Sequence, residues 1–437
     1  MAFDSSRYIP RGSVVLAGTT IASYILGLVR DRMLARTFGA SVSLDSYNAA
    51  FLIPDFLFNL LVASGIAAAA VPLFAELYRR SSKDAHEYAN SLLASAVGVM
   101  MLVAVLIGIF APALSFFVAP GLPEAGRLLV VHMMRILALS SIVFAASNAF
   151  GAMLVAQKRF LFYGLSPVAY NIGIIAGAVY LAPQFGIIGV AYGTVLGALF
   201  HLFVRLVDAM RSGWVWKWTP RPWGTTAMKR TFSLMVPKMI GHPVEMLTFW
   251  VFTGLASFLA EGSISVLNFA RNFQSVPVSI LGITMSTAIF PVLAEAILVS
   301  RAELRSVFRR TAWTILFTSI GAAIVVYGIR YQIVTLFLGG GAFNADAVAQ
   351  TAFVLGLFCL AIPTESLSHL FARAFYAAQD TRTPVIFSVL SLLVSGGSAY
   401  LFIHSYGIAG LPLGFFFGSF VKTAGLWVLF NRKISQR

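Results

Sequence analysis

Charged residues are scarce in this sequence, and their scarcity excludes a water-soluble fold. Only 11% of the 437 residues are Asp, Glu, Lys or Arg, whereas 59% are hydrophobic. A soluble globule of this length needs far more polar surface to cover its core. Within a bilayer the backbone must satisfy its own hydrogen bonds, and helices of apolar residues do so. The chain is therefore predicted to be an all-α, polytopic membrane protein.

Cysteine is almost absent, and the common catalytic motifs are missing. The single Cys359 lies in an apolar run, which excludes an internal disulfide and a cysteine-ligated metal. The sequence has no P-loop, no zinc-spaced His/Cys cluster and no strand-turn-helix setting for a nucleophilic serine. The first apolar run is followed by Arg30-Asp31-Arg32 instead of a small-residue cleavage site. We predict no enzyme activity, no cofactor, no metal and no cleavable signal peptide.

Apolar segments long enough to cross a bilayer recur along the whole chain. The hydrocarbon core takes about 20 residues of helix. Twelve spans are predicted, near residues 13–29, 47–77, 88–119, 128–155, 160–182, 186–210, 232–258, 263–299, 308–338, 347–377, 384–403 and 407–430. Several exceed the length of a perpendicular helix, so tilting or kinks at proline are expected.

The net charge of +15 is unevenly distributed between the two sides of the predicted spans. With a cytoplasmic N-terminus, most Lys and Arg lie in inner segments, and the outer segments hold only Arg32, Arg36, Arg127 and Arg330. This distribution follows the positive-inside rule and predicts that both termini are cytoplasmic. The basic charge therefore indicates orientation in the membrane, with membrane lipids as partners, and not nucleic-acid binding.

An internal repeat divides the chain into two halves. Val71-Pro-Leu-Phe-Ala-Glu76 returns as Phe290-Pro-Val-Leu-Ala-Glu295, and two further pairs, Gln157 with Gln379 and Gly186 with Gly407, have nearly the same offset. Because each half has an even number of spans, the repeat is parallel, about an axis along the membrane normal. We predict an N-terminal lobe at 1–210, an interfacial linker rich in Trp at 211–230, and a C-terminal lobe at 231–437.

Several polar side chains lie where a membrane makes them expensive. Asp55 is ten residues beyond the polar entry at Asp45, so it lies about 15 Å deep in the span. A carboxylate there costs roughly 2.5–3.5 kcal/mol before it finds a partner. Asn59 shares its helix face. Arg30, with Asp31 as its expected partner, lies at the end of the first span near the outer interface, and Arg271 lies well inside its span. We interpret both as cations that face an internal cavity, with interfacial snorkelling as the alternative for Arg30.

Two trios of charged residues follow helical spacing in the second half. Lys238, His242 and Glu245 lie at i, i+4 and i+7, and Glu365, His369 and Arg373 lie at i, i+4 and i+8. Each trio is either a polar network that joins helices or a coupling path for protons, since His with Glu on one face suits proton transfer. Both interpretations remain open.

The sequence resembles the MurJ (MviN) lipid II flippases of the MOP exporter superfamily. The resemblance rests on Ile25-Leu-Gly-Leu-Val-Arg30-Asp31, Phe38-Gly39, Asp45, Pro54, Val71 to Glu76, Leu281-Gly282 and Gln379-Asp-Thr-Arg-Thr-Pro384, and it spans nearly the whole chain. It implies a V-shaped fold of two six-helix lobes, alternating access, and movement of an undecaprenyl-pyrophosphate-linked peptidoglycan precursor to the outer leaflet of the bacterial inner membrane. Such proteins serve cell-wall synthesis and cell shape.

The resemblance also implies which residues bind the substrate. Cations suit a diphosphate because guanidinium binds phosphate in a bidentate manner. The predicted binding residues are Arg30, Asp31, Arg32, Asp45, Asp55, Asn59, Arg271 and Asn272, with the three aspartates holding the arginines. The sequence departs from the family in having Tyr24 and Phe58 or Asn59 where arginines are expected, and about twelve helices instead of fourteen.

Three other functions are consistent with the sequence. One is a flippase for another polyprenyl-diphosphate-linked saccharide, and rescue of peptidoglycan precursor export discriminates it. The second is a MATE-like small-molecule antiporter, which should show drug efflux. The third is a scaffold without transport activity, which would tolerate neutralisation of every charge in the cavity.

Overall fold

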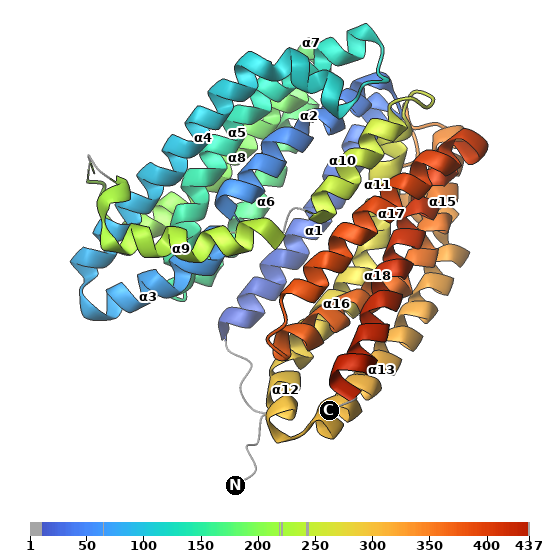
Figure 1. Cartoon of the computed structure of the whole chain (residues 1–437). Coiled ribbons are helices and arrows are strands. Elements are labelled where there is room, and N and C mark those ends of the chain that lie inside the picture. The colour runs from blue at the N-terminus through green and yellow to red at the C-terminus, as the bar shows by residue number, and fades with distance from the viewer. Residues whose placement is uncertain (1–10, 64, 218, 220–221, 242–243, 436–437) are drawn as a thin grey trace. The chain divides into compact units, whose positions relative to one another are not determined.

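The computed structural model describes residues 11–63, 65–217, 219, 222–241 and 244–435, with side chains omitted at 11, 13, 67, 68, 236–241 and 433–435. Within these ranges the chain is helical along almost its whole length and has no strand (Figure 1). A lone antiparallel bridge joins Gly340 and Phe343 in a loop. The predicted all-α class is confirmed.

The first of two compact units comprises Met1–Phe38, Ala49–Val118 and Pro123–Pro243. Its α-helices are α1 (Arg11–Phe38), most of α2 (Val42–Phe58), α3 (Val71–Arg80), α4 (Ser82–Val118), α5 (Glu124–Ala156), α6 (Phe160–Ala176), α7 (Ala182–Phe185), α8 (Ile187–Arg211) and α9 (Thr226–Gly241). Wider π-helical turns continue α2 at Asn59–Ala63 and Ile66–Ala70 and α6 at Gly177–Leu181, and a 3-10 turn covers Pro222–Gly224.

The second unit comprises Gly39–Asn48, Ala119–Leu122 and Val244–Arg437. It contains α10 (Val244–Ala256), α11 (Ser263–Pro277), α12 (Met285–Val299), α13 (Arg301–Gly328), α14 (Arg330–Phe337), α15 (Ala345–Phe358), α16 (Ile362–Ala377), α17 (Arg382–Tyr406) and α18 (Gly410–Ser435). A π-helical segment at Val278–Thr284 joins α11 to α12, and 3-10 turns lie at Cys359–Ala361 and Gly407–Ala409.

The two units repeat the same helix pairings. In the first unit α6 packs on α8 and α1, and α8 packs on α5, while in the second α17 packs on α18 and α10, and α18 packs on α16. Left-handed backbone recurs at matching turns, with φ of 60° at Lys158 and 58° at Gln379, and 59° at Gly186 and 57° at Gly407. The internal repeat predicted from the sequence therefore recurs in helix order and turn geometry, and the parallel relation of its two copies stays a prediction.

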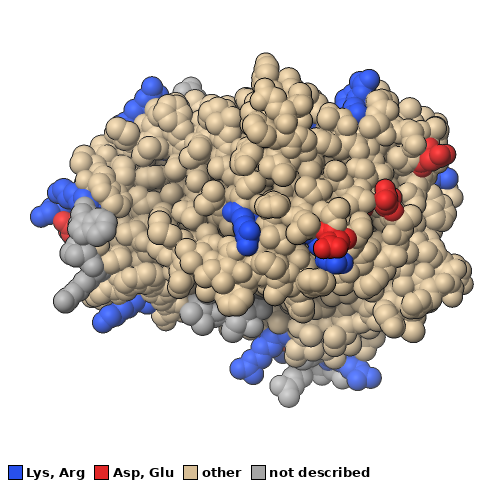
Figure 2. All heavy atoms as spheres, turned by 90° about the horizontal axis from the view of Figure 1, so that it is seen from above, with Lys and Arg blue, Asp and Glu red and all other residues tan. Residues whose placement is uncertain are grey.

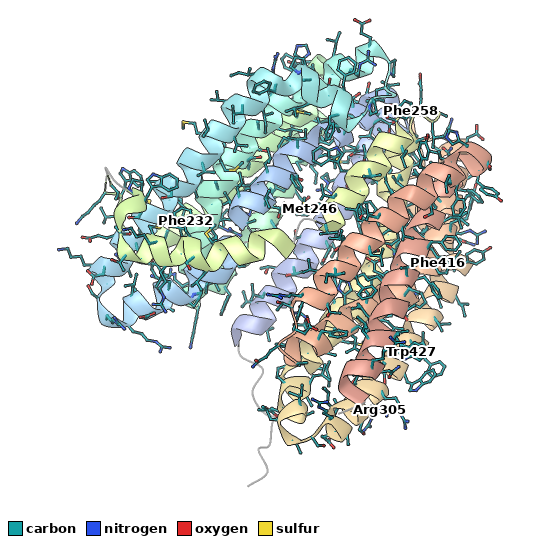
Figure 3. The ribbon with its side chains drawn as sticks, in the orientation of Figure 1. Phe232, Met246, Phe258, Arg305, Phe416 and Trp427 are labelled. Atoms are coloured by element: carbon teal, nitrogen blue, oxygen red, sulfur yellow. The ribbon has the colours of Figure 1, made fainter. Side chains whose placement is uncertain are left out.

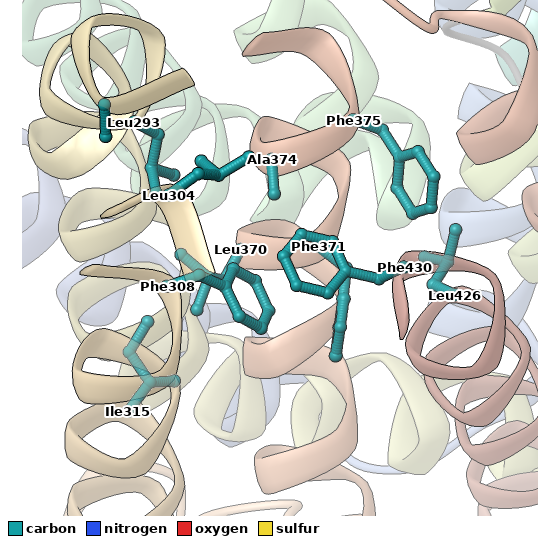
Figure 4. Close-up of a cluster of buried hydrophobic side chains, with 11 residues drawn as sticks. Leu293, Leu304, Phe308, Ile315, Leu370, Phe371, Ala374, Phe375, Leu426 and Phe430 are labelled. Carbon is teal, nitrogen blue, oxygen red and sulfur yellow. The ribbon is translucent and has the colours of Figure 1, made fainter. Parts of the chain in front are cut away.

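A phenylalanine-rich cluster forms the core of the second unit at one end of α13, α16 and α18. The rings of Phe308 and Phe430 lie 4.1 Å apart between centroids, and those of Phe308 and Phe371 lie 4.9 Å apart (Figure 4). Leu304 and Leu370 are fully buried beside them. Such packing can stabilise helix contacts inside a membrane, where the hydrophobic effect is absent, because it rests on close van der Waals contact.

The outer surfaces are apolar, as a membrane requires. Large side chains such as Trp427 and Phe258 are 56% and 66% exposed (Figure 3). The face shown in Figure 2 is mostly free of Lys, Arg, Asp and Glu. Among the described residues, ten helical segments are long and apolar enough to cross a membrane, one of which, Arg382–Arg432, contains both α17 and α18. The count of twelve spans stays a prediction.

Within the predicted seventh span, at 232–258, the structure describes two helices. α9 ends at Gly241, and α10, an apolar helix of 13 residues, begins at Val244. α9 groups with the first unit, and the predicted start of the second lobe at residue 231 stays a prediction. The Tyr88 hydroxyl on α4 lies 2.8 Å from the Thr231 hydroxyl on α9, and Arg230 donates to Glu76 on α3 at 2.9 Å. These contacts explain the grouping.

Candidate functional site

Arg271 is the centre of the strongest polar cluster that the second unit contains. It lies on α11 and donates from Nη2 to Glu365 Oε1 at 2.6 Å and from Nη1 to Glu365 Oε2 at 2.9 Å. The two side chains are only 15% and 8% exposed. Gln274, fully buried one turn along α11, accepts from Arg271 and donates to Glu365 Oε2 at 2.9 Å. Arg271, Glu365 and Gln274 thus form one network, in which the carboxylate of Glu365 balances the charge of Arg271 and hydrogen bonds join all three side chains.

Two aromatic rings enclose the same guanidinium. The Arg271 Cζ atom lies 4.9 Å from the ring centroid of Phe249 on α10 and 4.9 Å from that of Phe415 on α18. Glu245, 61% exposed on α10, adds a longer contact of 3.4 Å to Nη2. Four helices therefore meet at one cation, and the rings hold it by cation–π attraction. The sequence analysis singled out Arg271 but did not foresee Phe249 or Phe415.

Asp45 accepts three hydrogen bonds at the start of α11. Its carboxylate accepts from the backbone N–H of Gly262 at 2.8 Å and from the N–H and hydroxyl of Ser265 at 2.7 and 2.6 Å. It is 2% exposed. Asp45 thus caps the start of α11, where free N–H groups attract a negative charge. Its expected roles in substrate binding and in holding an arginine stay predictions.

Gly262 makes that cap possible. Its φ of +82° is left-handed, and a Cβ built on it would lie 2.5 Å from the backbone of Ala40. Only glycine tolerates both conditions. The close approach brings the chain that enters α2 against the chain that enters α11, so the carboxylate of Asp45 reaches the first turn of the helix that carries Arg271.

Arg30 and Asp31 pair as predicted, on α1 in the first unit. Arg30 donates to Asp31 Oδ1 from Nε at 2.9 Å and from Nη2 at 2.8 Å, and from Nη1 to Asn171 Oδ1 on α6 at 3.0 Å. The side chain of Arg30 stays 27% exposed. Arg32, half-buried, lies on the same helix. Because Arg30 and Arg271 belong to different units, the predicted shared cavity stays a prediction.

Asp55, Asn59 and Asn272 lie on exposed or half-exposed helix surfaces. Asp55 is exposed on α2, and no hydrogen-bond or ion-pair partner for its carboxylate exists among the described residues. Asn59 donates to the Asp55 backbone carbonyl at 2.9 Å, where α2 widens into π-helical turns. Asn272 is exposed next to Arg271 on α11. The predicted binding roles of these residues stay predictions.

The two predicted coupling trios are only partly described. The side chain of Lys238 and all of His242 lie outside the described residues, and Glu245 contacts Arg271. In the other trio Glu365 also binds Arg271, while Arg373 donates to the Thr287 hydroxyl at 3.4 Å. His369 is half-buried one turn beyond Glu365. Glu365 and Arg373 thus contact different residues, and a continuous proton path stays a prediction.

The sequence analysis missed a buried arginine in the first unit. Arg205 on α8 is 4% exposed and donates to Ser166 Oγ at 2.8 Å, to the Ser147 carbonyl at 3.1 Å and to Asn148 Oδ1 at 3.1 Å. Its Cζ lies 4.5 Å from the ring centroid of Tyr163. Because its hydrogen-bond partners are neutral groups on α5 and α6, Arg205 connects these two helices to α8. The sequence pattern that could have indicated this contact was an arginine inside an apolar run.

Arg159, in the turn between α5 and α6, anchors the same end of α8. It donates to the carboxylate of Asp208, and this hydrogen bond raises the pKa of Arg159 above its usual value. Asp208 is 2% exposed.

Among the described residues, no group of three or more His, Cys, Asp or Glu side chains is placed to hold a metal ion.

Comparison with known proteins gives one consistent result. A family model described as "Lipid II flippase MurJ" matches residues 34–436. The lipid II flippase MurJ of Burkholderia cenocepacia is 26% identical over 427 residues, which are 96% of this chain and 83% of the relative. The probable lipid II flippase MurJ of Haemophilus influenzae is 28% identical over 417 residues, 90% of this chain and 81% of the relative.

Two solved structures have the same fold. A lipid II flippase MurJ in an inward closed conformation aligns with a TM-score of 0.82 at 22% identity, over 95% of this chain and 87% of that one. An inward-facing multidrug resistance MATE family transporter of the MOP superfamily aligns with a TM-score of 0.78 at 15% identity, over 97% and 98%. At these identities the matches establish the fold. The chain is a multi-pass bacterial membrane protein with a transporter fold.

Proposed function

Because the chain belongs to the MurJ family of lipid II flippases, we propose that it moves lipid II from the inner to the outer leaflet of the bacterial cytoplasmic membrane. The movement follows alternating access, in which two units expose the site first to one side and then to the other. The single observation that carries the proposal is the family match across residues 34–436. Both termini lie in the cytoplasm, as the positive-inside distribution of Lys and Arg supports.

The diphosphate of the substrate binds to arginines that the protein already holds in place. In the first unit Asp31 and Asn171 accept hydrogen bonds from the guanidinium of Arg30, whose side chain is 27% exposed. Arg32 adds a second positive charge two residues on. Guanidinium and phosphate match in geometry and charge, so a preorganised arginine loses little entropy on binding. In the second unit Arg271 supplies a further cation.

Rescue of a strain depleted of its own lipid II flippase tests the proposal. Expression of this chain restores growth and normal cell shape, and purified protein in vesicles makes labelled lipid II accessible to a membrane-impermeant enzyme that cleaves the diphosphate. Failure of both assays with folded protein overturns the proposal. Restored export of a different polyprenyl-linked oligosaccharide, without rescue of peptidoglycan export, reassigns the substrate instead.

A small-molecule antiporter is the second candidate. The likeness to a MATE transporter, with a TM-score of 0.78 over 97% of the chain, favours it. The exposed carboxylates of Glu245 and Asp55 are the kind of group that an organic cation binds. Drug resistance in an efflux-deficient strain that disappears when both are neutralised would support it. No change in drug sensitivity on expression would exclude it.

A further inference from the structure

The terminal nitrogens of Arg271 are already engaged by the protein's own acceptors. Nη1 donates to Glu365 and Gln274, and Nη2 donates to Glu365 and Glu245. Two carboxylates therefore face one guanidinium. Since the bidentate fork of Glu365 occupies the edge formed by Nη1 and Nη2, a diphosphate can bind this edge of Arg271 only when Glu365 leaves it.

The three acceptors differ in how firmly they hold. Glu365 binds at 2.6 and 2.9 Å and is 8% exposed, whereas Glu245 lies at 3.4 Å and is 61% exposed. Gln274 is fully buried, and its amide donates to Glu365 Oε2 at 2.9 Å. Gln274 thus fixes the competing carboxylate as well as the cation. Glu365 is the acceptor that an anion must displace to bind Nη1 and Nη2 together, because only Glu365 spans both nitrogens.

Arg271 does not need Glu365 to keep its place. The rings of Phe249 and Phe415, each 4.9 Å from Cζ, hold the guanidinium from two other helices. Glu365 has a second electrostatic partner in His369, one turn along α16. When the carboxylate leaves the fork, the cation therefore remains in its aromatic setting and the acid remains next to an imidazole.

Building on the function proposed above, we propose that Glu365 is an intramolecular competitor for the substrate diphosphate at Arg271, with Gln274 as its positioning residue. Binding is then an exchange of one anionic fork for another, and release is the return of Glu365. The exchange lets a buried cation bind a doubly charged headgroup without holding it permanently. Because either the carboxylate or the diphosphate occupies the fork, the cation is never left uncompensated in the low-dielectric interior.

A purely structural ion pair gives the opposite prediction for a charge-neutral variant. If Glu365 only stabilises the unit, Glu365→Gln loosens the helices and weakens ligand binding. If Glu365 competes, the same variant binds a diphosphate more tightly, because the amide keeps the shape and loses the charge. A hydrogen bond to a charged group contributes enough that we expect a gain of about tenfold in affinity.

The test measures binding of undecaprenyl diphosphate to the purified full-length chain in nanodiscs, with undecaprenol as the uncharged control lipid. Glu365→Gln is expected to lower the Kd for the diphosphate about tenfold and leave undecaprenol unchanged. Gln274→Leu keeps both charges but releases Glu365, so it should lower the Kd by a smaller factor. Glu295→Gln, which removes an exposed carboxylate from α12 in the same unit, is the matched control and should have no effect.

The outcomes separate the inference from the function on which it rests. Adding Arg271→Ala to Glu365→Gln should abolish the gain, and Glu365→Gln should slow lipid II movement in vesicles because release becomes slow. An unchanged or higher Kd for both Glu365→Gln and Gln274→Leu, in proteins that melt as the wild type does, overturns the competitor role and leaves flipping intact. A wild type that neither binds the diphosphate nor moves lipid II overturns the proposed function.

Discussion

Replacing Asp45 tests whether a long-range cap fixes the helix that carries Arg271. Asp45→Ala removes the acceptor for three buried donors: the N–H of Gly262, and the N–H and hydroxyl of Ser265. Each buried donor left without a partner costs about 1–3 kcal/mol, so the loss for the variant is roughly 3–9 kcal/mol. Ser265→Ala removes one of the three contacts and should cost about 1–2 kcal/mol. The larger loss of stability for Asp45→Ala than for Ser265→Ala follows from the number of hydrogen bonds that each substitution removes.

Labelling of the single cysteine can follow the unfolding of the second unit. Cys359 is the single cysteine and is 4% exposed in the second unit, so a thiol-reactive dye labels it only when that unit opens. A change of 1 kcal/mol shifts the melting temperature of a unit this size by about 2–4 °C, which predicts a fall of roughly 6–36 °C for Asp45→Ala. Asp346→Ala, an exposed acid in the first turn of α15, is the control and should shift it by less than about 2 °C. Equal melting temperatures for Asp45→Ala and the wild type would refute the cap.

Three further substitutions have distinct expected outcomes. Arg205→Lys keeps the charge but loses the planar fork and the contact with the ring of Tyr163, so the first unit should melt at lower temperature, as scanning calorimetry would show; an unchanged transition would contradict its role in connecting the three helices. Gly65→Leu places a side chain where Met235 of α9 now packs, 2.3 Å from a built Cβ, and limited proteolysis should then cut near α9; wild-type resistance would argue against that packing. Asp55→Asn should reduce transport without changing the melting temperature, because the carboxylate has no partner among the described residues; a large loss of stability would show a structural role instead.

Apolar pattern and repeat predicted most of the helices, but they predicted apolar stretches and not helix ends. The first span was predicted at 13–29, whereas α1 continues to Phe38. The extra turns carry Arg30, Asp31 and Arg32, whose charges lower the local hydropathy although Asp31 and Asn171 satisfy Arg30 within the fold. The π-helical turns at Asn59–Ala63 and Val278–Thr284 leave no clear mark in a hydropathy pattern.

The sequence indicated which charged residues belong to the candidate site, but it did not indicate which of them contact each other. Arg271, Glu245 and Glu365 all stood out as charges in apolar spans, yet the fork between Arg271 and Glu365 joins positions 94 residues apart. The pairing of Asp45 with Ser265 spans 220 residues. No helical spacing encodes such contacts, because they depend on which helices pack together. Neighbouring contacts, such as Arg30 with Asp31, were predicted correctly because the chain itself places them side by side.

The most direct test of the central claim is a flipping assay on purified protein in sealed vesicles with fluorescent lipid II. Loss of fluorescence to a membrane-impermeant quencher gives the rate of transfer for the wild type, for Arg30→Ala and for Arg271→Ala, each shown by scanning calorimetry to melt as the wild type does. If buried guanidinium groups bind the diphosphate, the wild type transfers the lipid and each arginine variant is slowed at least about tenfold, as expected for the loss of one charged hydrogen-bonding partner. Equal transfer by all three proteins would contradict the account.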